Sequence, residues 1–155
     1  MKIHIETLGC PKNDNDSQLF GGRLAQSGHE IIHNAQKADA IIVNTCGFIN
    51  DAKKESIATI LEMARTKRPD AILVVSGCLT QRYGDELYQE IPEADIILGV
   101  NDYDKLPTLL SAFQAGRRQK YLSQTPNPDD WHFRRIDGEL YRATLKIAEG
   151  CDNCC

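Results

Sequence analysis

Short runs of β-branched and aliphatic residues, each separated from the next by a segment with helical spacing, constrain the fold more than any other feature. The runs cover residues 2–7, 40–43, 71–75 and 96–98, and the last three are apolar throughout. A strand of a parallel sheet that is buried on both faces has this composition, whereas a strand with one solvent-exposed face alternates apolar and polar residues. The runs therefore predict four strands of a parallel sheet.

The segments between these runs carry apolar residues at helical spacing. Positions 57, 60, 61 and 64 follow the i, i+3, i+4, i+7 pattern, and positions 106, 109, 110 and 113 repeat it. Asp16 or Ser17 is predicted to cap an earlier helix, Asn50 or Asp51 to cap the second, and a short helix is expected over 82–90.

Strands that alternate with helices predict right-handed crossovers and helices on both faces of the sheet. We therefore expect residues 1–115 to form an α/β domain with a doubly wound parallel sheet. Residues 116–138 are polar and rich in proline, and they are predicted to be a linker. Residues 139–155 regain strand-like alternation and are expected to begin a second domain.

The composition fits an ordinary soluble domain, with 41% hydrophobic and 26% charged residues. No apolar run approaches the roughly 20 residues that cross a bilayer, so no membrane span is expected. The amino-terminal residues lack the basic and apolar regions of a secretory signal, which predicts a cytoplasmic protein. A net charge of −4 argues against a broad basic surface for direct nucleic-acid binding.

Three of the six cysteines follow predicted strands. Cys10, Cys46 and Cys78 each stand at the carboxyl end of a run and beside a glycine. Those ends share one rim of a parallel sheet, where ligands usually bind. Thiolates are the usual ligands of iron-sulfur clusters, and three of them would leave one iron of a cubane without a protein ligand. The positions thus favour a metal cluster at this rim.

Other interpretations of these cysteines are open. A single free cysteine is most often a small core residue, which remains an alternative for each of the three. A closed zinc site needs four ligands, and no histidine stands near them in the sequence. A disulfide framework is not expected in the cytosol.

The remaining cysteines form the sequence Cys-Asp-Asn-Cys-Cys at the end of the chain. Cys151 and Cys154 make a C-x-x-C pair, typical of a redox or metal half-site. Cys151 and Cys155 make a C-x-x-x-C pair, with which the radical S-adenosylmethionine signature begins. Spacing alone does not choose between them.

Several motifs together resemble one family, the radical S-adenosylmethionine methylthiotransferases, and within it the RimO type. They are TLGCPKN at 7–13, ADAIIVNTCGFI at 38–49, SGCL at 76–79, IPEAD at 91–95 and IAEGCD at 147–152. They span nearly the whole chain. The resemblance implies an enzyme that methylthiolates an aspartate of a small-subunit ribosomal protein, and that meets nucleic acid only through the ribosome.

The resemblance also implies a cofactor set. Cys10, Cys46 and Cys78 would hold an auxiliary 4Fe-4S cluster. Cys151 and Cys155 would be the first two ligands of a second 4Fe-4S cluster that binds S-adenosylmethionine, with the third ligand beyond the end of the chain. We therefore expect the amino-terminal part of such an enzyme, inactive by itself, with no further catalytic residue assigned.

Two other functions compete with this one. The tRNA-modifying branch of the family usually has Gln and Met after the first cysteine, whereas this chain has Pro11, Lys12 and Asn13, which favours the ribosomal-protein branch. A function of another class is a flavodoxin-like binding module, not an enzyme, whose cysteines are core residues.

Overall fold

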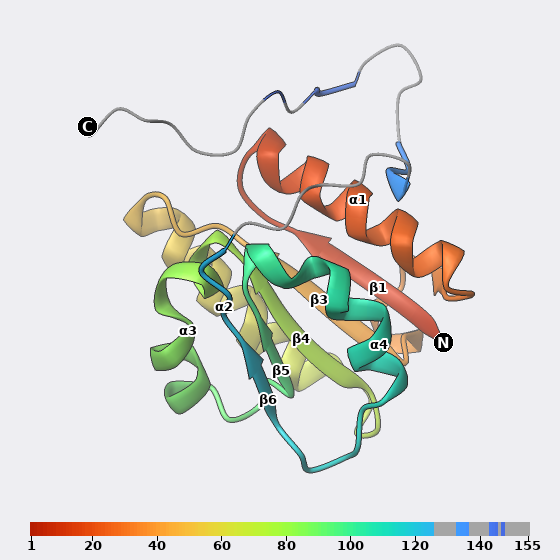
Figure 1. The fold of residues 1–155 in the computed structure, drawn as a ribbon. Helices are drawn as coiled ribbons and strands as arrows, with labels where there is room; N and C mark the ends of the chain where they lie inside the picture. Colours follow the sequence, from red (N-terminus) through yellow and green to blue (C-terminus); the bar gives the residue numbers. More distant parts are fainter. Residues whose placement is uncertain (126–132, 137–142, 146, 148–155) are drawn as a thin grey trace.

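The computed structural model describes residues 1–125, 133–136, 143–145 and 147. Its centre is a six-stranded sheet with the order β2-β1-β3-β4-β5-β6, in which every neighbouring pair is parallel (Figure 1). The strands are β1 Lys2–Thr7, β2 Glu30–Ile31, β3 Ala40–Thr45, β4 Ile72–Gly77, β5 Ile96–Leu98 and β6 Gln119–Tyr121. The predicted doubly wound α/β fold is confirmed.

Helices cover both faces of this sheet, as predicted (Figure 1). They are α1 Pro11–Gln26, α2 Asn50–Thr66, α3 Cys78–Glu90 and α4 Leu106–Ser111, with short 3-10 turns at Ala35–Lys37 and Val100–Lys105. Alternate side chains of the central strands point to opposite faces. Ile42 and Val74 pack with α1 and α4, while Val43 and Val75 pack with α2 and α3. Burial on both faces explains why β3 and β4 are apolar runs.

Helix α1 begins earlier than the sequence predicted. Asp16 or Ser17 was expected to cap its start, yet the helix begins at Pro11 with Cys10 as its N-cap. Asp16 and Ser17 lie inside the helix and are buried. Proline fits the first helical position because its missing N–H would have no partner there. The capping prediction was wrong because these polar side chains serve a buried network described below.

Helix α3 also begins earlier than expected, at Cys78 rather than near residue 82. Its first turn is separated from the rest by non-helical dihedral angles at Tyr83, where φ is −129° and ψ is 27°. The predicted range over 82–90 corresponds to the second part of the helix. Cys78 is consequently the first residue of a helix rather than part of a loop.

Two short strands were missed, and one of them falls within the predicted linker. Strand β6 occupies three residues that were expected to lie between domains, and it pairs with β5. It is recruited by tertiary contacts that local sequence does not carry: Arg118 donates to the carbonyls of Ala94, Tyr88 and Ile91. The boundaries of the domains remain predictions, since most of 126–155 lies outside the described residues.

The segment after β6 is held by a buried carboxylate. Asp102 is fully buried and accepts hydrogen bonds from Lys105, from the Ser123 hydroxyl and, at 2.7 Å, from the Ser123 amide. Burial alone raises the pKa of Asp102, but the hydrogen bonds from Lys105 and Ser123 outweigh it and hold that pKa below its ordinary value.

Among the described residues, no helix is long and apolar enough to cross a bilayer.

Candidate functional site

The three cysteines that follow strands line a single cavity at the carboxyl end of the sheet. This cavity, called the cysteine pocket here, has a volume of about 520 Å³. Its wall includes Cys10, Cys46 and Cys78, flanked by Lys12, Gln81 and Arg82. The sequence prediction that these cysteines meet at one rim agrees with this placement.

The register of the sheet explains the convergence. Thr45 at the end of β3 is paired with Gly77 at the end of β4, so Cys46 and Cys78 leave the sheet side by side. Strand β1 ends beside them, because Thr7 pairs with Asn44 and the Leu8 amide donates to the Asn44 backbone carbonyl at 3.0 Å. Each cysteine thus follows one of three adjacent strands.

Two glycines allow the connecting loops to touch. Gly9 has a φ of 96°, and a Cβ there would lie 2.5 Å from the Cys46 Cβ and 2.9 Å from its Sγ. Gly77 has a φ of 101°, and a Cβ there would lie 2.3 Å from the Thr45 carbonyl oxygen. Both glycines therefore make room for neighbouring backbone and side chains.

The three thiols differ in exposure. Cys10 is exposed, Cys78 is half-buried and Cys46 is 7% exposed. The Cys46 backbone is held by Ser56, whose hydroxyl accepts from its amide at 3.1 Å and donates to its carbonyl at 3.0 Å. Cys46 is therefore the most firmly enclosed of the three sulfur-bearing residues.

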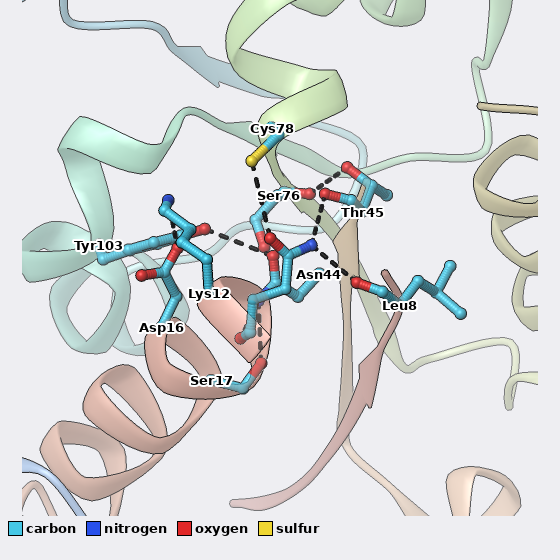
Figure 2. Close-up of polar contacts among 10 residues, drawn as sticks. Leu8, Lys12, Asp16, Ser17, Asn44, Thr45, Ser76, Cys78 and Tyr103 are labelled. Atoms are coloured by element: carbon cyan, nitrogen blue, oxygen red, sulfur yellow. Dashed lines mark hydrogen bonds and ion pairs between the residues drawn. The ribbon is translucent and has the colours of Figure 1, made fainter. Parts of the chain in front are cut away.

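The electrostatic surroundings of the pocket combine burial with positive charge. Burial raises the pKa of the Cys78 thiol, while the neighbouring Lys12 ammonium acts in the opposite direction. Lys12 is itself bound to the buried Asp16 at 2.6 Å (Figure 2). Cys10 and Cys78 also stand at the starts of helices α1 and α3, where the helix dipole favours negative charge. These positive groups partly offset the burial that disfavours the Cys78 thiolate.

A layer of buried polar side chains lies beneath the pocket (Figure 2). Asn44 donates to the Ser17 hydroxyl at 2.9 Å, Tyr103 donates to Asn44 Oδ1 at 3.4 Å, and Thr7 donates to Ser17 at 2.8 Å. These contacts satisfy polar groups that would otherwise be costly to bury. They join β1, α1 and β3 under the three cysteine-bearing loops.

No group of three or more His, Cys, Asp or Glu side chains within the described residues is arranged around a single metal ion. A zinc ion with bonds of about 2.3 Å would draw three sulfurs close together. A cubane binds each thiolate at a different iron, so its ligands stand further apart. Three thiols along one pocket are a donor set of the type that iron-sulfur clusters use.

The other candidate ligands are not placed. Cys151, Cys154 and Cys155 lie outside the described residues. Conversely, the sequence did not single out Gln81 and Arg82 as pocket residues. Their spacing of three and four from Cys78 would have indicated the shared face, had the helix been predicted to begin at the cysteine.

Comparison with known proteins identifies the family. The model of Uncharacterized protein family UPF0004 matches residues 2–99. Proteins named "Ribosomal protein uS12 methylthiotransferase RimO" are similar over 99% of the chain in Aliarcobacter butzleri, at 42% identity, and in Clostridium botulinum, at 46%. The protein of that name from Symbiobacterium thermophilum is 42% identical over 100% of the chain.

These relatives are longer than the chain. The matches span 33%, 35% and 33% of the three relatives, so the chain has about a third of their length. The relatives are named as enzymes, and the RimO resemblance seen in the motifs is confirmed by them. The chain therefore belongs to family UPF0004, and over nearly its whole length it is similar to proteins named RimO methylthiotransferases.

Proposed function

We propose that this chain carries the auxiliary cluster of a radical S-adenosylmethionine methylthiotransferase that acts on ribosomal protein uS12. The observation that carries the proposal is the convergence of Cys10, Cys46 and Cys78 on one pocket at the carboxyl ends of β1, β3 and β4. The names of the relatives support the reaction and the substrate.

Each pocket residue has a defined part in this proposal. The three cysteines would each bind one iron of a 4Fe-4S cluster through sulfur and leave the fourth iron open. Lys12 and Arg82 would offset the negative charge of the thiolates. Burial of Cys46 would keep water away from its side of the cluster. When bound, such a cluster would supply the sulfur-delivery chemistry of the methylthio transfer.

The second cluster is proposed on the family resemblance alone. Cys151 and Cys155 would bind two of its irons, and a third cysteine would come from sequence beyond this chain. S-adenosylmethionine would supply the radical that removes hydrogen from an aspartate carbon of the substrate, chemistry that belongs to the cofactor rather than to side chains. The chain alone would then be inactive, and its expected site of action is the cytoplasm.

Anaerobic reconstitution tests the cluster. A variant with Cys151, Cys154 and Cys155 changed to Ser removes the other thiols, and it should bind about four irons per chain, the content of one cubane. Adding Cys46→Ser should abolish most of that iron, whereas Ser111→Ala, which removes an exposed hydroxyl outside the pocket, should retain it. Equal iron with and without Cys46 would reject the assignment.

The substrate is tested with the longer enzyme that contains this sequence. The enzyme is incubated separately with purified uS12 and with tRNA, and the added methylthio group is measured in each substrate by mass spectrometry. Modification of uS12 is expected, and modification of tRNA alone would favour the other branch of the family. A flavodoxin-like binding module would modify neither, although the strand order 2-1-3-4-5 is shared with that fold.

A further inference from the structure

We propose that Asn13 is a positioning residue that ties the three cysteine-bearing segments to one another through its side-chain amide. The proposal rests on the proposed role of Cys10, Cys46 and Cys78 as cluster ligands, and it names the group that sets their arrangement. Asn13 is in the first turn of α1 and is fully buried.

The amide of Asn13 contacts all three cysteine-bearing segments, namely the loops before Cys10 and Cys46 and the start of α3 at Cys78. Its Nδ2 donates to the carbonyl of Leu8, in the loop before Cys10, at 2.7 Å. The same nitrogen donates to the carbonyl of Thr45, immediately before Cys46, at 3.0 Å. Its Oδ1 lies 3.6 Å from the Cys78 sulfur and accepts from that thiol. One buried side chain therefore links segments that are far apart in the sequence.

The orientation of this amide is fixed by chemistry. The nitrogen faces two backbone carbonyls, which are acceptors only, so turning the amide over would set its oxygen against both of them. The Asn13 backbone is held as well, because its carbonyl accepts from Asn44 Nδ2 at 2.9 Å. Asn13 can therefore place the loops of Leu8 and Thr45 with little freedom of its own.

The contacts differ in what they require. The contact with Cys78 needs a proton on its sulfur, so it is lost when that sulfur becomes a metal ligand. The two bonds to Leu8 and Thr45 involve backbone carbonyls and persist in either state. Asn13 thus holds the Cys10 and Cys46 loops together before and after loading, and it holds Cys78 in the unloaded protein.

The first test measures loop opening without any metal. The chain with its last three cysteines changed to Ser is reduced, and alkylation by iodoacetamide is followed at each thiol by mass spectrometry. Cys46, which is 7% exposed, should react slowly until its loop opens, whereas the exposed Cys10 reports intrinsic reactivity. In Asn13→Ala, alkylation of Cys46 should be about tenfold faster, the factor that ~1.4 kcal/mol gives, while Cys10 is unchanged.

Matched variants give the test its force. Asn15→Ala removes a similarly buried amide two residues further along α1, whose Oδ1 has no hydrogen-bond partner among the described residues. In this variant, Cys46 should be alkylated at nearly the same rate as in the chain with Asn13 and Asn15 intact. Asn13→Ser keeps one donor and should give an intermediate rate, and it carries the comparison if Asn13→Ala does not fold. A Cys46 rate in Asn13→Ser and Asn13→Ala no higher than in Asn15→Ala would overturn the proposal.

Iron retention separates this proposal from the one on which it rests. After anaerobic reconstitution, Asn13→Ala should lose iron to a chelator about tenfold faster than Asn15→Ala, the same ~1.4 kcal/mol. If neither the unmodified chain nor any variant binds iron, the cluster is rejected, whereas the alkylation rates still decide the role of Asn13. If all bind iron and release it at equal rates, the positioning role is rejected and the cluster stands.

Discussion

Replacing Gly77 with alanine should destabilise the protein by an amount that can be worked out from two separate effects. The residue adopts φ 101° and ψ −166° between β4 and α3, a region of backbone space essentially restricted to glycine. Holding alanine there costs about 1–3 kcal/mol. Alanine at another glycine with positive φ would have part of the same backbone cost, so such a variant can serve as a control.

The second effect is steric. A Cβ on Gly77 would lie 2.3 Å from the Thr45 carbonyl oxygen and 2.6 Å from both the Thr45 nitrogen and Asn44 Oδ1. Two of these atoms are backbone of the central strand β3, which cannot move aside as a flexible side chain would. Overpacking of this kind costs about 1–3 kcal/mol. After allowance for the smaller entropy of the unfolded alanine chain, the expected loss in the free energy of unfolding is about 1–5 kcal/mol.

Urea unfolding followed by circular dichroism, under reducing conditions, measures this loss. With an m-value of about 2 kcal/mol/M, the midpoint should fall by roughly 0.5–2.5 M. Gly116→Ala is the matched control, because Gly116 has a φ of 81° and a Cβ there would meet no atom of the described residues within 4 Å. That variant should lose only about 1 kcal/mol. Equal midpoints for the two variants would refute the claim that loop contact at the pocket depends on Gly77.

Two further perturbations test other parts of the structure. Asp102→Asn should lower the free energy of unfolding by about 1–3 kcal/mol at neutral pH. Folding lowers the pKa of Asp102, so the stabilisation that its carboxylate gives is present above the ordinary pKa of 3.8 and disappears as the pH falls through the folded pKa. Below about pH 4, the urea midpoint of Asp102→Asn should therefore depend less on pH than that of the unsubstituted chain. Gly22→Ala would place a Cβ 1.5 Å from the Phe133 carbonyl oxygen and should release that segment from α1, although alanine favours the helix by about 1 kcal/mol. Limited proteolysis near Phe133 should be faster in Gly22→Ala than in Gly21→Ala, and equal rates would count against the packing.

The central sheet was predictable because its signal is local. Most residues of β3 and β4 are apolar on both faces of the sheet, and an apolar run such as 71–75 is typical of a buried parallel strand. Strands β2 and β6 were missed for the opposite reason. Glu30–Ile31 is only two residues long, and Gln119–Tyr121 is polar, so pairing rather than composition makes each of them a strand.

The candidate site was predictable in outline only. Placing cysteines after parallel strands was enough to bring Cys10, Cys46 and Cys78 to one pocket. The supporting residues were not predicted. Asp16 and Ser17 have the composition of helix caps, and only the tertiary structure shows that they face Lys12 and Asn44 inside the protein.

The contact between Gly9 and Cys46 has a consequence for how the pocket would receive an occupant. Two of the three thiol-bearing segments already rest against each other, so the entropy of gathering them is lost when the chain folds and not when an occupant arrives. Loading should then raise the resistance of the whole fold to urea with the logarithm of occupant concentration, because an occupant that binds the folded chain and not the unfolded chain stabilises by mass action.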